Sequence, residues 1–89
     1  MNNDHMDLMI TKLYAAISKL STAEECRMFF NDLCTNKEIE QMAQRIEAAT
    51  LLKQGLTYNQ VIEQTDISSA TLSRVSRALQ YGEGYKKFI

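Results

Sequence analysis

The sequence predicts an all-α protein of about five to six helices, and two observations carry that prediction. The chain has 89 residues with no proline and three glycines, at positions 55, 82 and 84, so its first 54 residues contain neither strong chain breaker. A β-sandwich or barrel of this size needs turn residues about every 8–12 positions, and they are absent. Apolar residues instead recur at helical spacing between hydroxyl and amide residues that can cap helices.

Two helices are expected in the first third of the chain. The first should run from Asp4 or Asp7 to Leu20, with acidic residues at its positive N-terminal end. Ser21 and Glu24 have the spacing of a capping box and open a second helix to about Cys34. That helix carries apolar residues on several sides, so it should be buried on several sides, and a short chain needs a second copy to do so. These residues are Ala23, Cys26, Met28, Phe29, Phe30, Leu33 and Cys34.

The longest predicted helix begins at a second capping box, Thr35 to Glu38, and runs to about Gln54. Gly55 follows at the position where helices commonly end in a left-handed residue. The two cysteines are expected to be reduced residues of the core, because free cysteine is usually buried and one helix would hold them too far apart for a disulfide.

Residues 57–81, called here the helix-turn-helix segment, have the pattern of two short helices joined by a tight turn. Thr57 should cap a helix over 58–65, and Ser68 a helix over 69–81 that ends at Gly82. Asp66 stands where the turn needs a left-handed residue, which aspartate tolerates. Residues 84–89 can add a short final turn. The apolar positions expected to join the two helices are Val61, Ile62, Ile67, Leu72 and Val75.

The second helix of this segment exposes residue types suited to a DNA groove. Small side chains let a helix backbone approach base edges, hydroxyls hydrogen-bond to any base, and arginines reach phosphate. The N-termini of both helices add backbone N–H groups that can hold phosphate. The residues predicted to face DNA on this helix are Ser69, Ala70, Ser73, Arg74 and Arg77.

The charge of the chain does not decide between DNA and a protein as its partner, whereas its composition argues against an enzyme and a membrane protein. The chain has a net charge of −1, yet residues 68–89 hold four basic side chains and one acidic one. DNA is the favoured partner, and the alternative is a helical dimer that binds a protein through the same surface. One distant histidine, His5, and two cysteines are too few for a zinc site or a nucleophile-base pair, so no enzyme is expected. No apolar run approaches a membrane span, and no signal peptide is apparent, so we expect a cytoplasmic protein.

Three stretches, Arg45 to Gly55, Thr57 to Gln60 and Ser69 to Leu79, resemble the Trp repressor superfamily. The segments Asp32 to Asn36 and Gln44 to Glu47 are more similar still to its YerC/YecD branch of Trp-repressor-related bacterial proteins. The resemblance implies an interleaved all-α homodimer that acts as a transcriptional repressor and reads palindromic half-sites about 34 Å apart. Residues 1–56 would form the helical dimerisation core of this single domain, 57–81 the DNA reader, and 82–89 a C-terminal turn or short helix.

The resemblance also assigns residues to two sites. An effector site would use Thr35, Arg45 and Arg74, but Val75 and Ala78 replace a glycine and a serine that the family repressor has there. We therefore expect no dependence on tryptophan and no cofactor, although tryptophan or another small-molecule effector stays an open alternative. The predicted DNA-binding residues, with the family positions included, are Thr57, Tyr58, Asn59, Ser68, Ser69, Ala70, Thr71, Ser73, Arg74 and Arg77.

Overall fold

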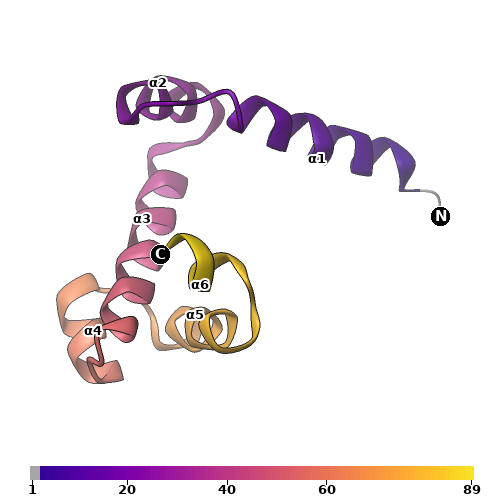
Figure 1. Cartoon of the computed structure of the whole chain (residues 1–89). Coiled ribbons are helices and arrows are strands. Elements are labelled where there is room, and N and C mark those ends of the chain that lie inside the picture. The colour runs from indigo at the N-terminus through magenta and orange to yellow at the C-terminus, as the bar shows by residue number, and fades with distance from the viewer. Residues whose placement is uncertain (1–2) are drawn as a thin grey trace. The chain divides into compact units, whose positions relative to one another are not determined.

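The computed structural model describes residues 3–89, which fold as two compact units. The N-terminal unit (Met1–Thr35, described from residue 3) contains α1 (Asp4–Ile17) and α2 (Ala23–Leu33). The C-terminal unit (Asn36–Ile89) contains α3 (Asn36–Lys53), α4 (Tyr58–Thr65), α5 (Ser69–Tyr81) and α6 (Gly84–Phe88) (Figure 1). All six elements found among the described residues are helices, as the sequence predicts. None of them is both long and apolar enough to cross a membrane.

The N-terminal unit departs from the sequence prediction at two helix ends. Helix α1 ends at Ile17 rather than Leu20, because the N–H groups of Lys19 and Leu20 donate to carbonyls three residues back and tighten the last turn. The N-cap of α2 is Thr22 and not Ser21. The Thr22 hydroxyl accepts from the N–H of Glu25 at 3.1 Å, and the Glu25 carboxylate accepts from the Ser21 N–H at 2.7 Å.

Neither helix of the N-terminal unit has a buried residue. Its exposed large apolar side chains are Met6, Leu8, Met9, Ile10, Leu13, Tyr14, Met28 and Leu33. Both cysteines are free, but Cys26 is exposed and Cys34 only half-buried, so the prediction of two core cysteines is wrong for a single chain. A single chain leaves the apolar surface of this unit uncovered. Uncovered apolar faces of this kind are where helices pack against another copy.

The C-terminal unit has a closed core. Figure 1 shows α4, α5 and α6 grouped around the C-terminal half of α3, and α5 packs against α3, α4 and α6. Helix α3 ends at Lys53, and Gly55 follows it with a left-handed φ of +94°, as expected. The Gly55 N–H donates to Leu52 O at 3.0 Å and the Leu56 N–H to Leu51 O at 3.2 Å. The buried residues are Ala48, Ala49, Leu51, Val61, Ile67, Leu72 and Val75.

Candidate nucleic-acid interface

The first helix of the helix-turn-helix segment begins at a complete capping box. The Thr57 hydroxyl accepts from the Gln60 N–H at 3.2 Å, and the Gln60 side chain accepts from the Thr57 N–H at 2.9 Å. These two bonds hold the first turn of α4 in place, so its exposed residues Thr57, Tyr58 and Asn59 lie on an ordered helix start. The cap and the helix bounds match the sequence prediction.

The turn between the two helices is bonded both within itself and to α3. Asp66 has a φ of 59°, which confirms the expected left-handed residue. The Thr65 hydroxyl donates to Val61 O at 2.7 Å and accepts from the Ile67 N–H at 3.2 Å. The side-chain amide of Gln44 in α3 donates to Thr65 O at 3.1 Å. The angle at which the chain leaves α4 is therefore set by side-chain bonds as well as by packing.

Ser68 is the N-cap of α5, as predicted. The Ser68 hydroxyl accepts from the Thr71 N–H at 3.2 Å and donates to the Thr71 hydroxyl at 2.9 Å. Thr71 is half-buried and bonded to its own helix start, whereas the other predicted DNA-facing residues are exposed.

One face of α5 is buried and the other is small and basic. Leu72 and Val75 are in the core, with exposed fractions of 0% and 2%. The exposed face carries Ser69, Ala70, Ser73, Arg74 and Arg77, and α5 has no acidic residue. Within the described part of the chain, no ion pair is found for either arginine, whereas Arg27 pairs with Glu24. This face can therefore offer its full positive charge to a polyanion.

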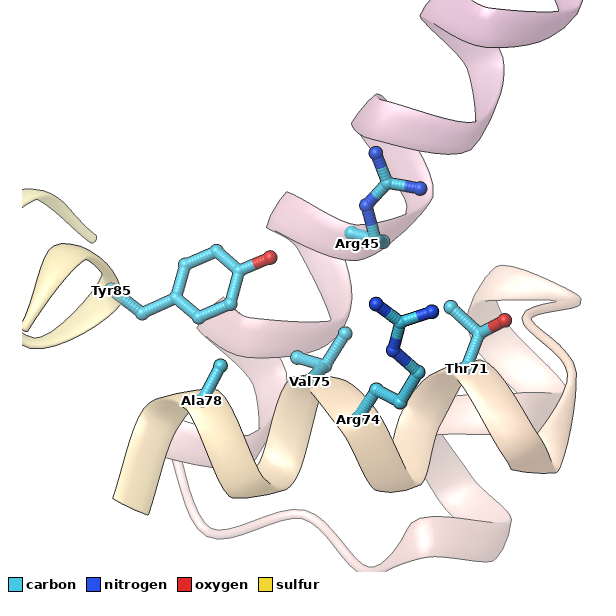
Figure 2. Close-up of a pocket in the computed structure, with 6 residues that line it drawn as sticks. All are labelled: Arg45, Thr71, Arg74, Val75, Ala78 and Tyr85. Carbon is cyan, nitrogen blue, oxygen red and sulfur yellow. The ribbon is translucent and has the colours of Figure 1, made fainter. Parts of the chain in front are cut away.

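A pocket of about 410 Å³ lies where α3, α5 and α6 meet (Figure 2). It brings together Arg45 of α3 and Arg74 of α5, the two arginines that the family resemblance assigns to an effector site. Figure 2 shows both guanidinium groups on one side of the pocket and the ring of Tyr85 on the other. Its remaining lining residues are Thr71, Val75 and Ala78. Thr35, the third predicted effector residue, is exposed at the end of the N-terminal unit.

Tyr85 is the pocket residue that the sequence pattern does not assign to a site. It is half-buried and packs against the core of the C-terminal unit. The position of Tyr85 depends on how the chain turns back toward the core after α5, and a local sequence pattern does not predict such a turn. The signal available in the sequence is Gly82, followed three residues later by an aromatic residue.

Two packed helices with capped starts, joined at the left-handed residue Asp66, and a small, basic outer face on the second helix are an arrangement typical of all-helical DNA-binding proteins. The chain belongs to the family described as Trp repressor protein, whose model matches residues 9–89. This family consists of regulatory DNA-binding proteins, so at the level of the family the chain is a DNA-binding regulator and not an enzyme.

Similar proteins from bacteria agree with this family assignment. The chain is 47% identical over 73 residues to the uncharacterized protein YerC of Bacillus subtilis strain 168, covering 82% of this chain and 70% of YerC. A crystal structure of a candidate Trp repressor from Staphylococcus aureus is 40% identical, with a TM-score of 0.85, over 97% of this chain and 88% of that one. A TrpR-like protein from Eubacterium eligens gives 40% identity and a TM-score of 0.86, over 97% and 90%.

Proposed function

We propose that this protein is a homodimeric repressor of transcription that reads palindromic DNA through residues 57–81 without requiring tryptophan. The observation that carries the proposal is the division of α5 into a buried face and an exposed face of small, hydroxyl and arginine residues without acids. A helix held rigidly by its apolar side can present its other side to the major groove. Since its relatives are bacterial, we place its action in the cytoplasm, where the chromosome lies.

The exposed residues divide by the chemistry they can offer. Ser69, Ala70 and Ser73 lie in the first turns of α5, where side chains reach base edges, and the alanine methyl suits a thymine methyl group. Arg74 and Arg77 supply charge for phosphate. The N-termini of α4 and α5, with the residues Thr57, Tyr58, Asn59 and Ser68, supply N–H and side-chain donors to the DNA backbone, and Thr71 orders the start of α5.

The exposed apolar surface of the N-terminal unit supports the homodimer. Met6, Met9, Ile10 and Leu13 recur at helical spacing along α1, and each is at least 36% exposed. An apolar stripe of this length on a lone helix is stable in water only when another surface covers it. With residues 1–56 of two chains as the dimerisation core, two helix-turn-helix segments related by a two-fold axis would read half-sites about 34 Å apart.

The lining of the pocket supports independence from tryptophan. Val75 is buried at its floor and Ala78 offers only a methyl group, so a bound amino acid meets a branched side chain and lacks one hydrogen-bond partner for its ammonium group. Arg45, Arg74 and Thr71 still offer donors to an anion, so a different small-molecule effector is an outcome that the test must include.

The proposal is tested by selecting bound sequences from a random pool of duplex DNA, with and without candidate effectors. We expect enrichment of a palindrome without any added ligand, and a lower affinity when Arg77 is changed to Glu. Enrichment only in the presence of tryptophan would contradict the independence from that ligand. If no sequence is enriched, charge reversal changes nothing, and a stable complex with another protein forms instead, the surface binds a protein and the proposed function is wrong.

A further inference from the structure

The chain turns back sharply after α5, and this turn requires a glycine. The N–H of Gly82 donates to Ala78 O at 2.8 Å. A Cβ atom at residue 82 would lie 2.6 Å from that same carbonyl oxygen, which is closer than real side chains approach backbone. The close approach lets the five residues of α6 return over α5.

Helix α6 is attached to the rest of the unit through Tyr85. A helix of five residues is not stable alone, so it depends on packing. All other residues of α6 are exposed, including Phe88 at 77%, whereas Tyr85 is half-buried against the core. The Ile89 N–H donates to Tyr85 O at 3.0 Å and so closes the helix around the residue that anchors it.

Tyr85 lies at the C-terminal half of α5, whereas the turn between α4 and α5 contacts only the N-terminal end of that helix. The N-terminal end of α5 is held by the Ser68 and Thr71 bonds and by the Gln44 bond to Thr65 O. Val75 is the last buried residue of the helix, and no residue from 76 to 81 is buried. The ring of Tyr85 lies beside Val75 and Ala78, and its hydroxyl points toward the space between α3 and α5 (Figure 2).

We propose that Tyr85 is a positioning residue, which holds the C-terminal half of α5 at its distance from α3 and so makes DNA binding independent of an added aromatic ligand. The inference rests on the proposed function, because it assigns to Tyr85 the control of the helix that would read DNA. An aromatic ring supplied by the chain itself is always present, so the exposed face of α5 is oriented in the free protein and no ligand has to order it.

The test removes the ring and returns it as a small molecule. Replacing tyrosine with alanine leaves a space beside Val75 and Ala78 that 4-methylphenol can fill, since spaces bordered by apolar side chains take up aromatic molecules. For Tyr85→Ala we expect a loss of about ten-fold or more in affinity for the selected palindrome, measured at a temperature where the variant is folded by circular dichroism. Millimolar 4-methylphenol should recover most of that loss and raise the melting midpoint of this variant alone.

Two variants serve as matched controls. Phe88→Ala removes an aromatic ring from the same helix at an exposed position, and it should bind DNA within about two-fold of the native chain and ignore 4-methylphenol. Tyr85→Phe keeps the ring and should bind within about three-fold. If Tyr85→Ala does not fold, Tyr85→Leu replaces it, with the same expected loss of affinity.

Each other outcome has a distinct meaning. A folded Tyr85→Ala or Tyr85→Leu variant that binds DNA as the native chain does would overturn the inference, and so would a loss in Tyr85→Ala that 4-methylphenol does not reverse. If the native chain itself has no preferred DNA sequence, the proposed function fails. The melting midpoint of Tyr85→Ala with 4-methylphenol then still shows whether the ring of Tyr85 stabilises the packing of α6 beside Val75 and Ala78.

Discussion

The two units of the chain differ in what a single copy can bury. The C-terminal unit closes a core of seven buried side chains around α3, whereas among the described residues of the N-terminal unit none is buried. Apolar side chains are nevertheless abundant in α1 and α2. A single copy therefore closes the core of the unit that carries the helix-turn-helix segment, and it leaves the apolar side chains of the other unit uncovered, which supports the proposed dimer.

The largest expected effect is in the core of the C-terminal unit. Leu72 is fully buried between α5 and its neighbours, so Leu72→Ala should lower the free energy of unfolding by about 2–5 kcal/mol, measured by urea denaturation. The control Leu72→Met keeps the volume and should cost less than about 1.5 kcal/mol. Equal effects of the two variants would show that this core is not closely packed.

The next effect concerns the N-terminal unit. Met9 lies on the apolar face of α1 and is 54% exposed in one chain, so Met9→Lys should leave the C-terminal unit folded and weaken dimerisation. Burying an unpaired ammonium group should raise the dissociation constant of the dimer by about 30-fold, or about 2 kcal/mol, measured by sedimentation. Lys12→Gln on the same helix is the control. An unchanged dissociation constant for Met9→Lys would place the dimer interface elsewhere.

A smaller effect is expected where α3 leads into α4. Gly55 has a left-handed φ of +94°, so Gly55→Ala should cost about 1–2 kcal/mol of stability although no atom lies near the added methyl group. Gly84 also has open space around it but no positive φ, and Gly84→Ala should change stability by less than about 0.5 kcal/mol. Similar melting midpoints for the two variants would argue against backbone strain.

The smallest effect compares single charges in the two units. Arg77→Gln should reduce the slope of log affinity against log salt by about 0.9 for each phosphate that the arginine neutralises. Arg27 of α2 instead donates to Glu24, which lowers the pKa of that carboxyl and raises the pKa of Arg27. Because its charge is already paired, Arg27→Gln should leave the slope unchanged. If Arg27→Gln reduced this slope as much as Arg77→Gln, DNA binding would depend on the net charge of the chain and not on the position of the arginine.

Local chemistry explains which parts of the fold the sequence predicts. The caps Thr57 and Ser68, the left-handed Asp66 and the terminator Gly55 each act within a few residues, so their patterns are visible in the chain. The predicted cap of α2 is wrong by one residue because Ser21 with Glu24 and Thr22 with Glu25 have the same spacing, and only the folded backbone distinguishes them.

The candidate site is predictable in part. The resemblance to a family pairs Arg45 with Arg74, and the structure brings them to one pocket. Tyr85 cannot be placed from the sequence, since its position depends on a close backbone approach at Gly82 and on packing between helices that are distant in sequence. A sequence pattern predicts a helix and its caps, because these depend on neighbouring residues. The packing of α6 against α5 depends on contacts throughout the core, so a local pattern does not predict it.

The mass of the full chain in solution tests the central claim, that residues 1–56 form a dimerisation core with a second copy while residues 57–81 carry the DNA-reading surface. Sedimentation equilibrium at micromolar concentration should give twice the chain mass of 10.2 kDa, with Met9→Lys shifted toward a single chain. A native chain that stays at 10.2 kDa over the whole concentration range, while still binding DNA, would contradict the account.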